Sequence, residues 1–412
     1  MKLRGLIIAM IVLVALMAAL YWSNRHPKTP ETTEASAEVA PKILSLKQDD
    51  ISSIDLKKKD ADEIVLAKNN GQWQITAPRQ LGADQSAMSS MLSALSSLNS
   101  DRLVEEKAGN LSQYGLADAP FEAVISEKDN KTQKLLLGDK TPSDNAVYAK
   151  LEGDPRIFTI ATYEKNNIDK SVNDLRDKRL ITANQDKISK VELLAKKQDI
   201  EFGRNKDEWQ IVKPKPLRAN GTQVDDLVRN LADAKMELSS SDDAKKIATA
   251  FASATPVATA RVTDESGTQE LQVRKNKEDY YAKSSVVDGI YKVPSSLGQA
   301  MDKGLDDFRN KKLFDFGYSD PNKVEIHDAS KSYFLTHGGE DWWNDSGQKL
   351  DAGTAQSLVD KVRDLSATKF VDSGFTQSIL DLTVVSNDGK RTEKVLISKS
   401  GDNYIAKREG EP

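Results

Sequence analysis

The residue types that most often carry catalysis or bind metals are scarce in this chain of 412 residues. It has no cysteine and three histidines, His26, His327 and His337. The lack of cysteine excludes disulfides, thiolate metal sites and cysteine nucleophiles. The histidines also lack the spacing of paired zinc ligands, so we expect His327 and His337 to be surface or strand-edge residues rather than ligands or bases.

Paired carboxylates are a second arrangement that could do chemistry, because two acids facing each other across a cleft can cleave a glycosidic bond. Adjacent pairs occur at Asp225-Asp226, Asp242-Asp243 and Asp306-Asp307. With 63 acidic residues in the chain, such pairs are more simply explained as helix starts and solvated faces. Phosphate-binding glycine loops are also missing from the sequence. We therefore expect no enzyme, no cofactor and no metal, and keep a carboxylate-dependent envelope enzyme as a third hypothesis.

Exposed aromatic side chains offer a different chemistry, the stacking contact with a sugar or a protein partner. Trp343 directly follows Trp342, and strand alternation would place the two side chains on opposite faces of a sheet. Tyr333, Phe334 and His337 lie nearby in the sequence. Trp343 with these three neighbours is our candidate for a partner contact.

Trp342 belongs to a phrase that occurs three times: a short strand, a tryptophan, and a helix with apolar residues at helical spacing. The three phrases begin at Ile54-Asp55-Leu56, Val191-Glu192-Leu193 and Val324-Glu325-Ile326, and their tryptophans are Trp73, Trp209 and Trp342. Because the tryptophans recur at nearly equal intervals, we predict three tandem copies of one module. We expect each tryptophan to be buried under the helix of its module.

The pattern within each copy predicts an α+β module, an antiparallel sheet covered by an amphipathic helix. The expected helix caps are Asp84, Thr222 and Asp351, each followed by apolar residues three or four positions apart. A strand with an Ala-Lys pair is expected to close every module. These strands are Val147-Tyr148-Ala149-Lys150, Tyr280-Tyr281-Ala282-Lys283 and Tyr404-Ile405-Ala406-Lys407.

A second repeated phrase, residues 174–180 and 307–313, lies before the first strand of the next copy and is predicted to be a connector between modules. Its basic residues could bind an anion, but neighbouring aspartates balance them, so we favour an inter-module hinge held by apolar packing. The predicted hinge residues are Leu175, Arg176, Arg179, Leu180, Phe308, Arg309, Lys312 and Leu313. The expected modules are residues 43–183, 184–318 and a shorter 319–412.

The first residues predict a membrane anchor. After a basic tail, residues 1–4, the 18 residues 5–22 carry no charge, and a helix of that length just spans the hydrocarbon core of a bilayer. Tyr21 and Trp22 suit the interface, and residues 23–42 read as a flexible tether. A cleaved signal peptide is the alternative, although its cleavage site would lie far beyond the apolar run. The small basic excess at residues 1–4 predicts an inside N-terminus and an outside globular part.

At this point the chain resembles the bacterial domain of unknown function 4340. The resemblance is carried by the Trp-x-Ile/Val strand, the proline after it, the following helix, and the Leu/Phe-Arg-Asp/Asn-Lys-Arg/Lys-Leu connector. It implies membrane-anchored extracytoplasmic proteins that accompany auxiliary components of gliding-type ABC transporters. It implies no catalytic residue.

Together these features predict a single-pass protein of the bacterial inner membrane with its large part on the periplasmic or extracellular side. We expect a scaffold or accessory subunit of an envelope complex, with a membrane protein complex as partner. The alternative is a binding module for cell-wall glycan or polysaccharide. A net charge of only −4, with both signs mixed, offers no field for nucleic acid.

Overall fold

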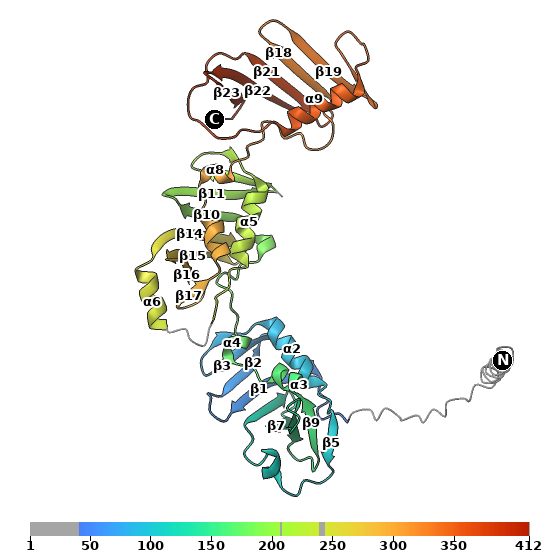
Figure 1. Ribbon diagram of the computed structural model, residues 1–412, viewed down its shortest axis with the longest axis vertical. Helices are drawn as coiled ribbons and strands as arrows, with labels where there is room; N and C mark the ends of the chain where they lie inside the picture. The colour runs from blue at the N-terminus through green and yellow to red at the C-terminus, as the bar shows by residue number, and fades with distance from the viewer. Residues whose placement is uncertain (1–40, 207, 239–243, 412) are drawn as a thin grey trace, which may run out of the picture. The chain divides into compact units, whose positions relative to one another are not determined.

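Residues 41–206, 208–238 and 244–411 are described by a computed structural model, and they form three mainly antiparallel sheets accompanied by helices (Figure 1). The sheets have nine, eight and six strands. The chain divides into two compact units between Asp177 and Lys178, and the second unit contains both the second and the third sheet. We call the parts built around the three sheets modules 1, 2 and 3.

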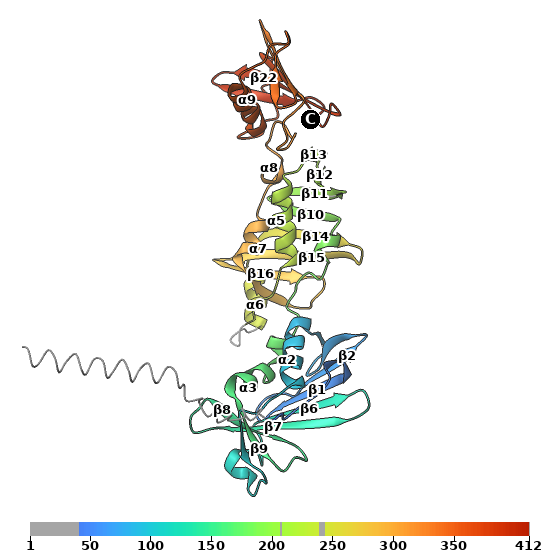
Figure 2. The ribbon, with the colours of Figure 1, turned by 90° about the vertical axis from the view of Figure 1, so that its right-hand side faces the viewer.

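Module 1 has the strand order β4-β3-β2-β1-β6-β7-β8-β9-β5. Its strands are β1 (Ile51–Lys58), β2 (Ile64–Asn69), β3 (Gln72–Ala77), β4 (Leu81–Gly82), β5 (Arg102–Glu105), β6 (Phe121–Glu127), β7 (Thr132–Lys140), β8 (Ala146–Leu151) and β9 (Ile157–Ala161). Its helices are α2 (Gln85–Ser96), α3 (Thr162–Ile168), α4 (Val172–Leu175), η1 (Gln48–Asp50) and η2 (Leu111–Tyr114). Helices α2 and α3 are in contact and lie side by side over the sheet (Figure 2).

The sequence explains the first half of module 1 locally. Asn70 and Gly71 adopt positive φ angles in the turn between β2 and β3, as hairpin turns require. Alternation along β3 buries Trp73 and Ile75 on one face. Asp84 caps α2 by accepting hydrogen bonds from the backbone N–H groups of Ser86 and Ala87. The buried residues of α2 are Met88, Met91, Leu92 and Leu95.

Module 2 repeats this plan with the order β13-β12-β11-β10-β14-β15-β16-β17. Its strands are β10 (Lys190–Ala195), β11 (Gln198–Asn205), β12 (Glu208–Lys213), β13 (Leu217–Arg218), β14 (Thr255–Asp264), β15 (Gly267–Asn276), β16 (Asp279–Ser284) and β17 (Ile290–Val293). Its helices are α5 (Gly221–Ala232), α6 (Ala244–Ala252), α7 (Ser295–Met301), α8 (Leu305–Phe308) and η3 (Gln185–Lys187). The predicted cap Thr222 is wrong: Asn220 caps α5, accepting from the N–H of Gln223, and the helix begins at Gly221.

Module 3 has the order β20-β19-β18-β21-β22-β23. Its elements are β18 (Lys323–Asp328), β19 (Ser332–Gly338), β20 (Asp341–Trp343), α9 (Ala352–Asp364), β21 (Leu380–Ser386), β22 (Arg391–Ser400) and β23 (Asn403–Arg408). Asp351 caps α9 as predicted, and α9 packs its Ala355, Val359 and Val362 against the sheet.

The prediction that the Ala-Lys strand closes every module is wrong for the first two modules. In module 1, β8 pairs with β9, which leads into α3; in module 2, β16 pairs with β17, which leads into α7. Strands β9 and β17 are short, and they are recognised as strands only by their pairing with a neighbouring strand. Within the described residues, the Ala-Lys strand β23 is the final strand of module 3 alone.

The cores of the modules also include residues at the end of each connector or directly after it. Leu180 and Ile181 are buried in the core of module 2, and Phe314 and Phe316 in that of module 3. The observed division after Asp177 therefore lies before the expected boundary at residue 183. The predicted anchor over residues 5–22 lies outside the described residues; within residues 41–206, 208–238 and 244–411, no helix is long and apolar enough to cross a membrane.

The two adjacent tryptophans of module 3 give a matched test of this fold. Trp342 is 2% exposed in the core, whereas Trp343 is 36% exposed on the opposite face. We expect Trp342→Ala to destabilise module 3 by about 3–5 kcal/mol, because a large side chain is removed from a packed interior. Trp343→Ala should change stability by no more than about 0.5 kcal/mol. Denaturant unfolding of both variants measures this, and equal losses would contradict the assigned faces.

Candidate functional site

The predicted aromatic contact is divided between the two faces of the module 3 sheet. Trp342 and His337 are directly opposed in the β19–β20 register, with ring centroids 4.6 Å apart, so His337 lies on the buried face. Alternation puts Tyr333 on that same face and Phe334 with Trp343 on the other. The four residues therefore do not form one patch, because β19 turns successive side chains to opposite sides.

The face that carries Trp343 mixes charged, polar and apolar side chains, and several of its charges are paired with each other. Phe334 lies between Lys323, whose Nζ is 5.2 Å from the ring centroid, and His327, whose ring is 5.4 Å away. Lys323 Nζ also contacts a carboxylate oxygen of Glu325 at 2.6 Å. The hydrogen bond from Lys323 lowers the pKa of Glu325 more than partial burial raises it. Trp343 thus lies on a face on which Lys323 and Glu325 are already paired with each other.

His327 joins a nucleophile–base–acid line that the sequence spacing did not suggest. Its Nδ1 is 2.7 Å from the Ser332 hydroxyl and its Nε2 is 3.5 Å from Glu325. Ser332 is the cross-strand neighbour of His327, which explains the contact by register alone. Glu325 also pairs with Lys323. Ser332, His327 and Glu325 line neither of the two surface depressions described below. The arrangement has the residue types of a triad, and cross-strand pairing accounts for its closest contact.

The described carboxylate pairs are occupied by structural contacts. Asp225 accepts a hydrogen bond from the Trp209 indole N–H at 2.9 Å, and Asp226 pairs with Arg229. Asp307 accepts from the N–H of Gly304 at the start of α8. Asp242-Asp243 lies outside the described residues. These contacts explain the aspartates as caps and packing partners.

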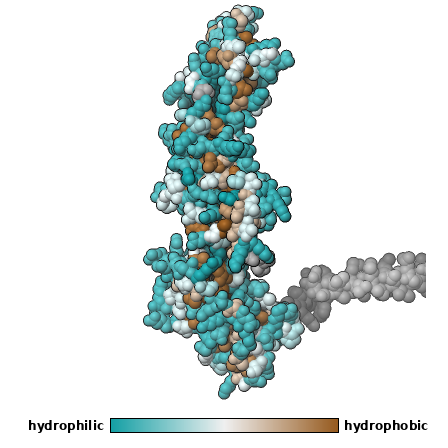
Figure 3. Space-filling model, turned by 90° about the vertical axis from the view of Figure 1, so that its left-hand side faces the viewer, coloured by the Kyte–Doolittle hydropathy of each residue, from teal (hydrophilic) through white to brown (hydrophobic). Residues whose placement is uncertain are grey.

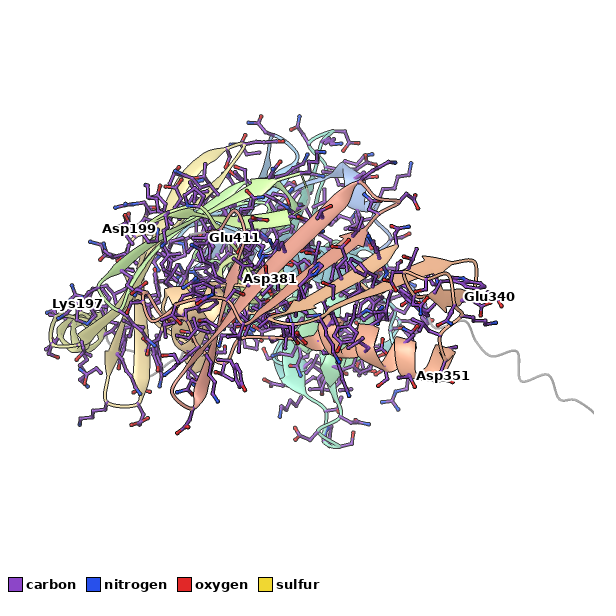
Figure 4. The ribbon with its side chains drawn as sticks, turned by 90° about the horizontal axis from the view of Figure 1, so that it is seen from above. Lys197, Asp199, Glu340, Asp351, Asp381 and Glu411 are labelled. Carbon is purple, nitrogen blue, oxygen red and sulfur yellow. The ribbon has the colours of Figure 1, made fainter. Side chains whose placement is uncertain are left out.

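Among the labelled carboxylates of module 3 in Figure 4, Asp381 lies apart from Glu340 and Asp351. Figure 4 shows Asp381 on the module 3 sheet, while Glu340 and Asp351 lie towards the end where β20 and α9 meet. Asp55, on the open face of β1, has its pKa raised by burial and by the nearby charge of Glu63. Among the described residues, no group of three or more potential ligands could hold a metal ion.

Two depressions occur on the surface of the second unit. One, of about 870 Å³, follows the solvent side of α9 from Gly353 to Ser366. The other, of about 400 Å³, lies at the second connector between Asn220, Asn310 and Asp315. The visible face in Figure 3 is mostly hydrophilic, with small hydrophobic patches. Leu365 is the one large hydrophobic residue among those that line the two depressions, whereas most small-molecule sites are lined mainly by hydrophobic and aromatic side chains.

The first connector is fastened to the module on each side by the same kind of backbone contact. Its first half binds the segment before α2: the Asp84 N–H donates to the Leu175 carbonyl and the Asp177 N–H to the Gly82 carbonyl, both at 2.8 Å. Its second half binds the segment after α5, where the Leu180 N–H donates to the Ala234 carbonyl. Leu175 and Leu180 are fully buried in the cores of modules 1 and 2 respectively.

The second connector repeats these contacts. The Asn220 N–H donates to the Phe308 carbonyl at 2.7 Å, and the Leu313 N–H donates to the Leu365 carbonyl at 2.8 Å. Phe308 is fully buried against Phe202, with ring centroids 4.9 Å apart, and Leu313 packs on the core of module 3. Arg309 lies over the Phe370 ring at 3.4 Å.

Burial also bears on the anion alternative for the basic residues. Arg176 is only 3% exposed, and Arg309 lies 3.4 Å from Asp306. Arg179 and Lys312 make isolated β-bridges with Lys235 and Ser366 through their backbones. Burial of Arg176 and local pairing of Arg309 favour packing over an open anion site.

A charged network that sequence reasoning missed surrounds the second connector. The Arg218 guanidinium contacts Asp315 at 2.7 Å and Glu411 at 2.6 Å, and donates to the Lys312 carbonyl at 2.7 Å. Arg408 contacts Glu411 at 2.8 Å and Glu393 at 3.1 Å. Glu393, 5% exposed, also accepts from the N–H of Asp315 at 3.0 Å. The network ties strand β13 of module 2 to strands β22 and β23 of module 3.

Corresponding positions at the first connector are neutral. Strand register and the repeated contacts identify the corresponding residues. Gly82 corresponds to Arg218 and Thr182 to Asp315. Gln269 corresponds to Glu393 and Ser284 to Arg408. The Gln269 amide binds Thr182, as Glu393 binds Asp315, and the Ser284 hydroxyl donates to the Leu180 carbonyl, as Arg408 donates to that of Leu313. At these positions the two connectors make the same contacts to the module that follows, through neutral side chains in module 2 and charged side chains in module 3. A register-based alignment of the repeats would have found this signal.

The fold and connectors define a class of protein, a tandem-repeat α+β protein. In this class each connector is hydrogen-bonded to the neighbouring modules and contributes residues to their cores. The sequence model of one family, Domain of unknown function (DUF4340), matches residues 73–209 and 209–382. Since the matches cover more than half of the chain, the protein belongs to this family. Each match starts at a repeated tryptophan and includes a connector, which places the connector within the family's unit. No curated protein and no solved structure matches the chain.

The charged junction makes a specific prediction. Glu393→Gln introduces the residue type of Gln269 and removes one of the two carboxylates that contact the mostly buried Arg408, while Glu411 remains at 2.8 Å, so we expect module 3 to lose about 1–3 kcal/mol of stability. The double variant Glu393→Gln/Arg408→Ser copies the neutral pair of module 2 and should recover part of that loss. Thermal unfolding of both variants measures the effect. If the single variant were as stable as the unaltered protein, the network would be no constraint on module 3.

Proposed function

We propose that this protein is a membrane-tethered, extracytoplasmic scaffold or accessory subunit of an envelope complex, and that its partner belongs to a gliding-type ABC transporter system. The observation that carries the proposal is the repeated arrangement of modules and connectors in the described part of the chain. Three similar modules are joined by fastened connectors, and the chemically reactive residue types serve as caps, pairs and packing contacts. Such a chain offers several similar surfaces to a protein partner.

The predicted apolar segment, residues 5–22, supplies the second part of the proposal. A single span followed by a tether would hold the modules at the membrane surface and raise their effective concentration beside a membrane protein. The assignment to a transporter system rests on the family resemblance and not on any contact within the modules. Localisation at the inner membrane, with the modules outside the cytoplasm, belongs to the same proposal.

Purification from membranes tests this function. We expect the full chain to co-purify with a defined set of membrane proteins from mild detergent. A control variant, Leu13→Arg/Leu16→Arg, should leave the membrane fraction, because each arginine near the centre of a span costs about 2.5–3.5 kcal/mol. Recovery of the chain as a lone species in several mild detergents would contradict the proposal.

A binding module for cell-wall glycan is the second candidate, and the exposed ring of Trp343 favours it. Retention of the protein on isolated wall material, lost in Trp343→Ala, would support the glycan function. Because a scaffold needs no glycan, we expect no retention for either protein. Trp343→Phe, which keeps an aromatic ring, is the matched control for stacking.

A further inference from the structure

Five equivalent apolar positions of the three modules differ in burial. The strand registers align them: Ile54–Ile125, Val191–Val262 and Val324–Val384 are corresponding pairs, and the next strands continue in step. In module 3 the five positions are Leu358 of α9, Leu380 of β21, Ile397 of β22, and Tyr404 and Ala406 of β23. We call these five residues the α9–β23 face.

In modules 1 and 2 every counterpart of the α9–β23 face is buried. The counterparts are Met91, Phe121, Leu137, Val147 and Ala149 in module 1, and Leu227, Ala258, Val273, Tyr280 and Ala282 in module 2. In module 3, Leu358, Leu380 and Ile397 are partly exposed, and Ala406 is exposed. Tyr404 is 67% exposed, whereas Tyr280 at the same position is 8% exposed. The difference therefore concerns a whole face and not a single side chain.

A strand followed directly by a helix covers these positions in modules 1 and 2. Strand β9 pairs with β8 and leads into α3; β17 pairs with β16 and leads into α7. Both helices contact the helix of their module, α2 or α5, and the strand that they cover. A Cβ atom added to Gly298 of α7 would lie 2.1 Å from the Tyr280 ring, which shows how closely this helix is seated.

The described part of module 3 has no strand or helix in this place. Strand β23 pairs with β22, and among the described strands none pairs with its other edge. That edge presents backbone donors and acceptors, which an added strand can satisfy. The α9–β23 face and the open edge thus lie side by side, as the strand and the helix do in modules 1 and 2. Two modules of the same chain show which shape fits there.

We propose that the α9–β23 face binds a strand–helix segment of a partner protein. The strand would pair antiparallel with β23, and a short amphipathic helix would lie against α9, with a small residue over Tyr404 as Gly298 lies over Tyr280. A second copy of this chain fits less well, because its own strand–helix segments are already seated in modules 1 and 2. Pairing of β23 with a second β23 would extend the sheet but leave Tyr404 and Ala406 uncovered.

This proposal rests on the proposed function, since it names where the partner of the scaffold docks. The first experiment tests the face without the partner. We append a copy of residues 290–302, with one glycine before it, after Pro412 of the full chain, which gives a loop of similar length to that between β16 and β17. We call this lengthened protein the filled chain. It should show an upward shift of about 4–8 °C in the Tm of module 3.

A matched control separates specific seating from mere extension. Leu297 and Met301 are buried against the module 2 core, so the appended copy is also made with both positions changed to aspartate. This control copy should give no upward shift in Tm. Equal Tm values for the filled and control chains would overturn the proposed fit of a strand and helix to the face.

The second experiment identifies the occupant in intact membranes. A photoreactive phenylalanine analogue replaces Tyr404, and in separate proteins Trp343 or Tyr163, a 64% exposed residue of module 1. We expect an adduct with a different protein from position 404, at least tenfold reduced in the filled chain and retained in its control. Little adduct should form from position 163.

Each other outcome overturns a defined part. An adduct between two copies of this chain would show that a second copy, and not a different protein, occupies the α9–β23 face. An adduct from Trp343 but not from position 404, or one that persists in the filled chain, would overturn the docking face and leave the proposed function standing. No protein adduct from any position, together with purification as a lone species, would overturn both.

Discussion

The structure depends on one constraint: each antiparallel sheet has one apolar face, and helices must cover it. Burial of the repeated tryptophans and of the apolar residues of α2, α5 and α9 meets this constraint near the centre of each sheet. In modules 1 and 2, α3 and α7 extend the cover to β8 and β16. The architecture is therefore a series of sheets whose covering elements decide which surfaces remain open.

The connectors meet a related requirement. Backbone N–H and C=O groups next to the start and end of each module helix need hydrogen-bond partners, and the connectors supply them. Each connector satisfies backbone groups before the helix of one module and after the helix of the next, and buries an apolar residue in each core. Equivalent positions beside the two connectors carry neutral side chains in module 2 and charged side chains in module 3, so the shared feature is the set of hydrogen bonds made by the connector backbone. Removal of the buried Glu393 carboxylate costs stability because it takes one of two carboxylate partners from the mostly buried Arg408.

Much of this fold could be predicted from local pattern. The three modules, the buried tryptophans, and the caps Asp84 and Asp351 follow from spacing and from short-range hydrogen bonding. The short strands β9 and β17 could not, because four or five residues carry too little periodicity to identify a strand before its partner is known. The cap of α5 was misplaced for a similar reason: Asn220 and Thr222 are both good caps, and backbone geometry selects between them.

The candidate sites divide in the same way. The sequence by itself determined the module repeat, the connector, and the opposed directions of Trp342 and Trp343, because these depend on residue type and on the two-residue period of a strand. Only the tertiary structure decided that His337 lies opposite Trp342, that Arg218, Glu393 and Arg408 meet, and that Tyr404 is uncovered whereas Tyr280 is buried. These facts depend on strand register and on which helix lies over which strand, and both are set by contacts between residues far apart in the chain.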